Sequence, residues 1–257
     1  MAQLRGAAAR RFEATFGRRP AVGCWIGLPS PFSAEIMGLA GFDFALIDLE
    51  HGPGGFEAAG AQMMALAAAG RTAPIVRVAD ASPARIKRAL DLGAQAVMLP
   101  QIETPEQAAA AARAARYGPD GARGVATRIV RAARYGADED YEARWNETGV
   151  VIAQIESPDA LAGAGEIAAV EGVDALFFGP ADYAAAAGYP GAAEVERAFA
   201  ALTEAARGAG KAIGTVTFAG AAAADLVARG VDLVSVASDV SLLRRGAEQA
   251  LKAARGG

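Results

Sequence analysis

The chain has 257 residues, a length that suits one α/β barrel or two small domains. Apolar residues make up 53% of it, which is enough for a large core. Its net charge of −4 gives no reason to expect nucleic acid or an anionic membrane as a partner. Cys24 is the only cysteine, so an intrachain disulfide is excluded and a reducing compartment, the cytoplasm, is expected.

Residues 1–20 have the pattern of an amphipathic helix and lack the apolar core of a signal peptide. No membrane span is expected, because no window of about 18 residues is apolar without charges or repeated glycines. Short apolar runs then alternate with helical segments, as is typical of parallel strands buried on both faces. Strands are predicted near 21–28, 44–49, 75–78, 96–99, 150–155, 175–178, 212–217 and 233–237. Helices are predicted near 32–40, 56–70, 83–92, 105–116, 158–170, 193–208, 220–229 and 240–254.

This succession of strand–helix units predicts a TIM (β/α)8 barrel with an N-terminal helix and a long loop before the fifth strand. No composition break divides the chain, so a single domain over 1–257 is expected. A doubly wound open sheet is the alternative, although no glycine-rich nucleotide loop follows the first strand. The long connection, 117–149, carries Arg123, Arg128, Arg131 and Arg134. It is either a solvated excursion or a lid or subunit contact that brings basic groups to an anionic site.

Two carboxylates stand at or just beyond the ends of neighbouring predicted strands, Glu156 after 150–155 and Asp182 after 175–178. Ligands bind at this end of parallel strands, and paired carboxylates suit a hard cation such as Mg²⁺ or Mn²⁺. The alternative is structural, because Ser157 followed by proline is a good helix start. Asp80 and Glu103 precede similar helix starts, so local sequence alone does not choose among these carboxylates.

A second group of polar residues follows the second and third predicted strands. His51, the only histidine, follows Asp48 and Glu50, and Asp48 could orient or charge-stabilise the imidazole as a base near neutral pH. Arg77 is expected within a buried strand, where its charge must be paired. It could form a structural ion pair with Asp48 or Glu50, or bind a substrate carboxylate and stabilise an enolate.

Lysine chemistry is not expected. Lys87 lies in a predicted helix, Lys211 precedes a strand and Lys252 lies near the C-terminus, so none is placed for a Schiff base. No G-x-S-x-G nucleophile motif is present, and a pair of Cys24 with the histidine is only a weak possibility.

The chain closely resembles the HpcH/HpaI aldolase family, the metal-dependent class II pyruvate aldolases of the phosphoenolpyruvate/pyruvate superfamily. The resemblance covers nearly the whole chain. It rests on GFDFALIDLEHGP (41–53), IVRV (75–78), LDLGAQAVMLPQIET (90–104), YGPDGARGV (117–125), VIAQIES (151–157), EGVDALFFGPADY (171–183) and GVDLVSVASDVSLL (230–243). One departure is Tyr183-Ala184, where the family usually has Leu-Ser after GPAD.

The resemblance implies a TIM barrel and a role for each matched residue. Glu156 and Asp182 would ligate a divalent cation, Mg²⁺, Mn²⁺ or Co²⁺. His51, assisted by Asp48, would be the acid/base group acting through water, and Arg77 would stabilise the pyruvate enolate. Further substrate contacts are implied for Gln154, which would line the pyruvate site, and for Gly179, Pro180 and Ala181, whose backbone would meet the pyruvate carboxylate.

The implied activity is reversible aldol cleavage of a 4-hydroxy-2-oxo acid to an aldehyde and pyruvate, or a close 2-oxo acid such as hydroxypyruvate. One alternative is an acyl-CoA lyase of the citrate-lyase type, with the arginines of 117–149 supplying a CoA groove. Another is a noncatalytic 2-oxo-acid-binding barrel. The resemblance also implies a homohexamer, a trimer of dimers with an exchanged C-terminal helix.

Overall fold

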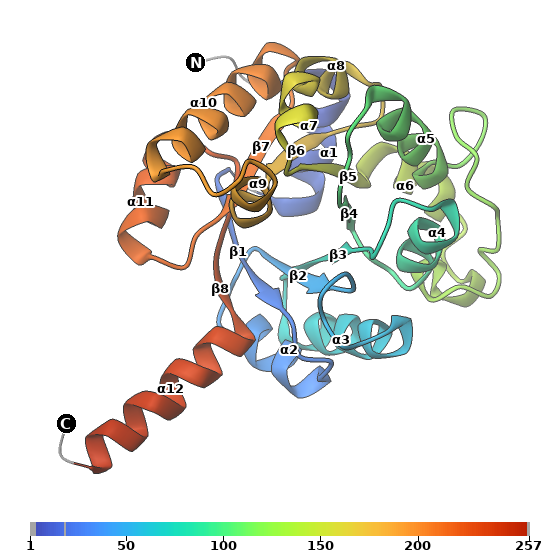
Figure 1. The fold of residues 1–257 in the computed structure, drawn as a ribbon. Helices are drawn as coiled ribbons and strands as arrows, with labels where there is room; N and C mark the ends of the chain where they lie inside the picture. The colour runs from blue at the N-terminus through green and yellow to red at the C-terminus, as the bar shows by residue number, and fades with distance from the viewer. Residues whose placement is uncertain (1–3, 18, 256–257) are drawn as a thin grey trace.

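The computed structural model describes residues 4–17 and 19–255 and confirms the predicted TIM barrel. Parallel strands pair in chain order, and β8 closes the barrel against β1 (Figure 1). The strands are β1 (Ala21–Ile26), β2 (Phe44–Asp48), β3 (Ala73–Arg77), β4 (Ala96–Leu99), β5 (Val150–Ile155), β6 (Ala175–Phe178), β7 (Ala212–Val216) and β8 (Leu233–Ser238). Each predicted strand lies within two residues of the observed one, because nearly every strand residue is apolar and buried.

The described residues also form helices, most of which follow a strand and cover the outside of the barrel (Figure 1). They are α1 (Gly6–Phe16), α2 (Pro31–Leu39), α3 (Phe56–Ala69), α4 (Pro83–Asp91), α5 (Pro105–Ala115), α6 (Tyr141–Thr148), α7 (Pro158–Ala162), α8 (Ala164–Ala169), α9 (Pro180–Ala186), α10 (Ala192–Gly208), α11 (Gly220–Ala228) and α12 (Asp239–Ala254). The helix predicted over 158–170 is interrupted at Gly163, and neither α6 nor the short α9 was predicted.

Two apolar cores hold the barrel together. One lies between the strands and the surrounding helices, and the other fills the barrel interior. The N-terminal helix α1 supplies Phe12 and Phe16 to the interior core, and Phe16 packs edge-on against Phe44 of β2. Because α1 packs beneath β5 and β7, it closes the N-terminal end of the barrel and leaves the other end for ligands.

The long connection over 117–149 is not an open excursion. It contains a 3₁₀ segment, Arg131–Gly136, and helix α6. Arg123 is buried, pairs with Asp91 at 2.7 Å and lies over the Tyr117 ring at 4.5 Å. Arg131 donates to the carbonyl of Leu92. Two of the four arginines therefore hold the connection against the barrel, whereas Arg128 and Arg134 are exposed.

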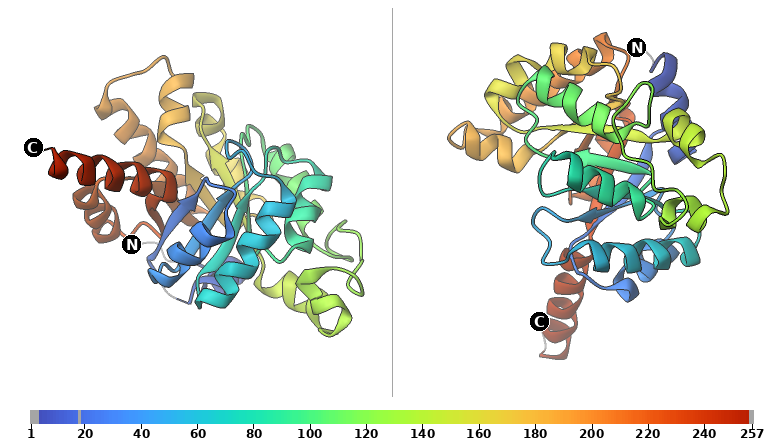
Figure 2. Two further views of the ribbon diagram at one scale, coloured as in Figure 1. Left: turned by 90° about the horizontal axis from the view of Figure 1, so that it is seen from below. Right: turned by 90° about the vertical axis from the view of Figure 1, so that its right-hand side faces the viewer.

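The last helix, α12, extends away from the barrel (Figure 1 and Figure 2). Asp239 anchors its start by accepting hydrogen bonds from the backbone of Gly27 and Leu28 and from the Ser33 hydroxyl. Beyond that anchor, Val240, Leu242, Leu243 and Leu251 are exposed. Throughout the part of the chain that the structure describes, no helix combines the length and apolar character needed to cross a membrane.

Candidate active site

Asp48 and Arg77 end adjacent strands and pair in register at the C-terminal end of the barrel. The carboxylate of Asp48 accepts two hydrogen bonds, from Nε of Arg77 at 2.9 Å and from Nη2 at 2.7 Å. Burial alone would raise the pKa of Asp48, but the hydrogen bonds and charge of Arg77 outweigh it and the pKa is lowered. The pair is therefore held ionised and in one geometry.

The guanidinium of Arg77 is enclosed on its other sides. Nη1 of Arg77 lies 2.9 Å from Oε2 of Glu50, and Cζ of Arg77 lies 4.5 Å from the centre of the Trp25 ring. The expected ion pairing of Arg77 is confirmed, with Asp48 and Glu50 both as partners. Asp48 accepts from Nε and from one hydrogen of Nη2, whereas the contact of Nη1 with Glu50 is an ion pair in which Oε2 of Glu50 accepts no hydrogen bond. Nη1 and the second hydrogen of Nη2 are therefore donors that remain for a substrate oxygen.

His51 projects from the loop after β2, with a side chain that is 67% exposed. Its backbone N–H donates to Oδ1 of Asp48, and its Nε2 lies 3.9 Å from Oε2 of Glu50. Gly52 makes this turn possible, because a Cβ at that position would lie 2.2 Å from the carbonyl oxygen of Asp48. Among the described residues, Asp48 thus holds the backbone of His51, and Glu50 is the carboxylate near the imidazole.

Glu156 follows β5 and is only 6% exposed. Its Oε1 accepts the backbone N–H of Gln101 at 2.9 Å, and its Oε2 accepts Nε2 of Gln154 at 2.6 Å. Burial raises the pKa of Glu156 to about 7, the N–H of Gln101 opposes this, and the charges of Asp182 and Glu50 raise it further. Negative charge is therefore in excess around Glu156.

A divalent cation fits this excess of negative charge. Asp182 is exposed in the first turn of α9 and acts electrostatically on Glu156. Oε1 of Gln154 is buried without a hydrogen-bond partner, so a further oxygen is free beside the carboxylates. Within residues 4–17 and 19–255, no three His, Cys, Asp or Glu side chains converge on one point, so a cation bound here would take no more than two such side chains. That is the usual situation for Mg²⁺, which keeps water and substrate oxygens as its other ligands.

The segment from Gly179 to Ala181 packs closely against this pair. A Cβ at position 179 would lie 3.0 Å from both Nε2 of Gln154 and Oε2 of Glu156, so a residue larger than glycine would displace the carboxylate of Glu156. The N–H of Gly179 already donates to Ile155, and Pro180 has no N–H. The backbone donor that this segment leaves for a carboxylate is that of Ala181, in the first turn of α9.

At Tyr183-Ala184, where the resemblance led us to expect Leu-Ser, the structure shows a packing role. Tyr183 is 5% exposed, and its ring packs against Phe178 with centroids 5.3 Å apart. Tyr183 therefore attaches α9 to the outside of the barrel, one residue from Asp182.

The three lysines lie away from these residues. Lys87 and Lys252 are exposed on α4 and α12, and Lys211 precedes β7, at the opposite end of the barrel. Cys24 is buried in β1, and burial raises the pKa of its thiol to about 12, so it is not a thiolate near neutral pH.

Two further residues belong to the site and were not assigned to it from the sequence. Gln101 follows β4 with a backbone φ of 52°, which directs its N–H at Glu156. Glu50 lies between Arg77 and His51, and the sequence indicated it only as a possible ion-pair partner of Arg77. The positive φ of Gln101 could not be predicted, because nothing in the sequence marks a glutamine that adopts it. The position of Glu50 next to the only histidine, in contrast, was a signal that could have identified it.

Comparison with known proteins identifies relatives along most of the chain. The family model described as HpcH/HpaI aldolase/citrate lyase matches residues 21–246. A protein of Deinococcus radiodurans named hydroxypyruvate/pyruvate aldolase is 43% identical over 238 residues, covering 91% of this chain and 86% of the relative. One with the same name from Chromohalobacter salexigens is 40% identical, covering 95% and 97%. A crystal structure of an HpcH/HpaI aldolase/citrate lyase family protein from Burkholderia cenocepacia has a TM-score of 0.89 and 41% identity, covering 96% and 99%.

Proposed function

Because this chain belongs to the HpcH/HpaI aldolase/citrate lyase family, we propose that it cleaves 4-hydroxy-2-oxo acids reversibly to an aldehyde and pyruvate or hydroxypyruvate. Its relatives are named aldolases, so the protein is a carbon–carbon lyase of the class II type. The observation that carries the choice of site is the joint placement of Arg77 and Glu156 at the ligand-binding end of the barrel.

The family depends on divalent metal, and Glu156 and Asp182 are the residues that would hold the cation here. Mg²⁺, Mn²⁺ and Co²⁺ are all suited to this oxygen donor set. When bound, the cation would supply Lewis acidity that stabilises negative charge on the 2-oxo acid. Gln154 holds Oε2 of Glu156 by a hydrogen bond from its Nε2, and its own Oε1 is buried without a partner.

Arg77 supplies the second source of positive charge. Cleavage of the bond between C3 and C4 leaves the electron pair on the three-carbon product as an enolate. The free hydrogens on Nη1 and Nη2 of Arg77 can donate to that oxygen, and they do so without reorganisation because Asp48 and Glu50 already hold the guanidinium. The backbone N–H of Ala181 is the donor available to the carboxylate of the 2-oxo acid.

Proton transfer is assigned to His51. In cleavage, its imidazole removes the proton of the C4 hydroxyl through water, and in synthesis it returns that proton to the new alkoxide. Asp48 positions the backbone of His51, while Glu50, 3.9 Å from Nε2, stabilises the imidazolium once it forms.

A retro-aldol screen tests the proposal. The protein is incubated with a panel of 4-hydroxy-2-oxo acids and Mg²⁺, Mn²⁺ or Co²⁺, and pyruvate or hydroxypyruvate is measured. Metal-dependent release of the 2-oxo acid is expected. Metal and pyruvate binding without turnover on any substrate would instead favour a noncatalytic binding barrel.

The acyl-CoA lyase alternative rested on a basic groove formed by the arginines of 117–149. Arg123 is buried among aromatic rings, and Arg131 is directed at the carbonyl of Leu92, so neither is free for a CoA phosphate. Saturation by CoA thioesters but not by free 2-oxo acids would revive this alternative.

The proposed assembly is a cytoplasmic homohexamer, a trimer of dimers with exchanged C-terminal helices. The support is that α12 projects from the barrel with apolar residues exposed, and that α2 exposes Phe32, Ile36 and Leu39. Exposed apolar surface of this kind is typical of subunit interfaces. Mass measurement in solution is expected to give a species larger than a dimer, and an active monomer of about 26 kDa would refute the proposal.

A further inference from the structure

A separate cavity of about 700 Å³ lies at the N-terminal end of the barrel, away from the carboxylates described above. It is bounded by α1, the end of α5 and the segments that precede β6 and β7. Its basic lining residues are Arg5, Arg11, Arg113, Arg116 and Lys211, against two acidic ones, Asp120 and Glu171. The volume is that of a small-molecule site rather than of a single bound ion.

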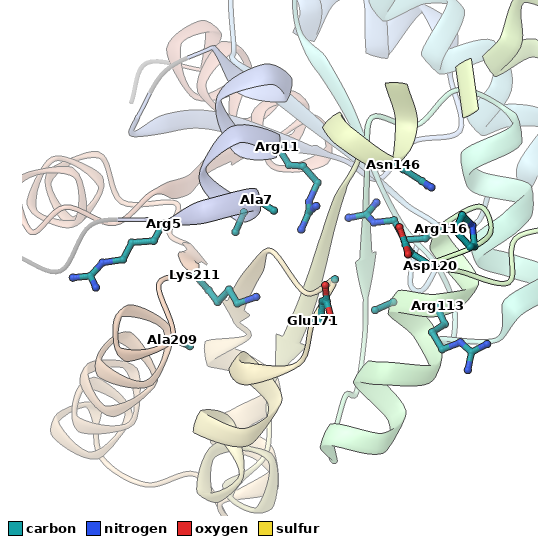
Figure 3. A pocket seen from close by; sticks show the side chains of 14 residues that line it. Arg5, Ala7, Arg11, Arg113, Arg116, Asp120, Asn146, Glu171, Ala209 and Lys211 are labelled. Carbon is teal, nitrogen blue, oxygen red and sulfur yellow. The ribbon is translucent and has the colours of Figure 1, made fainter. Parts of the chain in front are cut away.

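Two arginines of this cavity share one carboxylate. Arg11 and Arg116 come from different segments and point toward one another (Figure 3). Nε of Arg11 lies 2.7 Å from Oδ1 of Asp174, and Nη2 of Arg116 lies 3.0 Å from Oδ2. Asp174 is fully buried and carries one negative charge, so one guanidinium charge stays uncompensated by this contact.

Arg116 also has an unused donor. Its side chain is 7% exposed, yet its Nη1 has no hydrogen-bond partner within the described structure. Burial lowers the pKa of Arg116 to about 10, Asp174 opposes this, and the like charges of Arg11 and Arg123 lower it further. An anion entering the cavity would relieve this repulsion.

Lys211 adds a third positive charge from the opposite wall. Its Nζ donates to the carbonyls of Val173 at 2.6 Å and Val170 at 3.3 Å, which are neutral acceptors. The third ammonium hydrogen therefore remains for a ligand. Figure 3 shows Lys211 pointing into the same space as Arg11, whereas Arg5 and Arg113 are at the rim and point outward.

We propose that this cavity binds a small phosphate monoester, with the phosphate between Arg11, Arg116 and Lys211. Donors arriving from three directions suit the oxygens of a tetrahedral phosphate better than the two of a planar carboxylate. Ala7, Ala8, Ala112, Pro119, Gly172 and Ala209 line the remaining wall and leave room for a short carbon skeleton. The surplus of positive charge favours an anion and disfavours cationic ligands.

Calorimetric titration of the full-length, Mg²⁺-loaded protein with glycerol 3-phosphate tests this assignment, with glycerol and inorganic phosphate as parallel probes at matched ionic strength. Saturable binding of glycerol 3-phosphate is expected, weaker binding of inorganic phosphate and none of glycerol. Inorganic phosphate binding as tightly as the ester would overturn the assignment to an ester. Absence of binding by both phosphates would overturn the site.

Variants place the binding in the cavity. Lys211→Gln, which keeps a donor for the two carbonyls, should weaken binding about tenfold or more, since it removes a charged hydrogen bond. Arg113→Gln, at the rim, should weaken binding only about two- to threefold. Arg197→Gln is the matched control, because Arg197 is an exposed arginine of α10 outside the cavity lining, and it should bind as the wild type does.

Arg77→Gln distinguishes this cavity from the proposed active site, where a phosphate could also meet a guanidinium. Binding should persist in Arg77→Gln and be weakened about tenfold or more in Lys211→Gln, with circular dichroism showing that both variants are folded. The opposite pattern would place the phosphate at the active site and overturn the inference. If Lys211→Gln does not fold, Lys211→Arg should retain binding, while Arg5→Gln combined with Arg113→Gln should weaken it.

Discussion

The backbone N–H of Gln101 donates to Oε1 of Glu156 across 2.9 Å, from a residue whose φ is 52°. A non-glycine residue rarely adopts this conformation, and such strain concentrates at functional sites. The contact joins the end of β4 to the end of β5 and directs a backbone donor at a proposed metal ligand. Gln101 therefore has a positioning role that depends on its backbone.

Exchanges of Gln101 should separate backbone geometry from side-chain identity. Gln101→Gly should retain the N–H contact and the Mn²⁺ affinity, and should raise stability by up to about 1 kcal/mol because glycine adopts positive φ without strain. Gln101→Val should weaken Mn²⁺ binding, because a β-branched residue disfavours this φ. Calorimetric metal titration and urea unfolding measure both effects. Equal metal affinity in the two variants would contradict the positioning role.

Variants of the two proposed metal ligands should lose metal affinity while remaining folded. Glu156→Gln and Asp182→Asn remove a negative charge each and keep the side-chain volume, so Mn²⁺ affinity should fall by about tenfold or more. Chelation should abolish turnover in the wild type, and Mg²⁺, Mn²⁺ or Co²⁺ should restore it. Glu166→Gln, on exposed α8 surface, is the control. Full turnover of a chelated, metal-free sample would exclude metal dependence.

His51→Ala should separate proton transfer from metal binding. Metal and pyruvate affinity should persist, while aldol turnover should fall by about 10²–10⁴, the usual contribution of a positioned general base. Exchange of the pyruvate methyl protons with D₂O should slow as well, as followed by NMR. Asp48→Asn should cost less turnover than His51→Ala, and Glu50→Gln tests the nearer carboxylate. Wild-type turnover in metal-loaded His51→Ala would move the base role to Glu50 or to water.

The Asp48–Arg77 pair should make the free energy of unfolding depend on pH. The pKa of Asp48 in the folded chain is below its ordinary value of 3.8. The ionised carboxylate therefore contributes to the free energy of unfolding at pH values above 3.8, and this contribution is lost as the pH falls through the lower folded pKa. Asp48→Asn breaks a largely buried pair and should cost about 3 kcal/mol near neutral pH. The difference in unfolding free energy should stay constant from pH 5 to 7 and shrink below about pH 4. A difference that grows toward acid would contradict this sign.

No imine should form with pyruvate. The three lysines lie on α4, on α12 and before β7, and none is at the C-terminal end of the barrel. Treatment with borohydride in the presence of pyruvate should neither inactivate the protein nor add mass, as measured by intact mass spectrometry. A pyruvate-sized adduct on Lys87, Lys211 or Lys252 would overturn the class II assignment.

The barrel itself followed from local patterns in the sequence. Strands buried on both faces must be short and apolar, and their spacing leaves room for one helix between each pair. Those patterns located the strands to within two residues and placed Asp48, Arg77, Glu156 and Asp182 at or beside strand ends. They did not show the short α9, or the break at Gly163, because short helices carry few periodic residues.

Which polar groups meet was decided by the tertiary structure. The sequence by itself determined the fold and the end of the barrel at which Asp48, Arg77 and Glu156 would lie, because burial and strand direction are properties of each segment. Only the closed barrel brought Arg77 between Asp48 and Glu50, and directed the N–H of Gln101 at Glu156. Such contacts depend on strand register and on backbone angles set by neighbouring strands, which no single segment of the sequence contains.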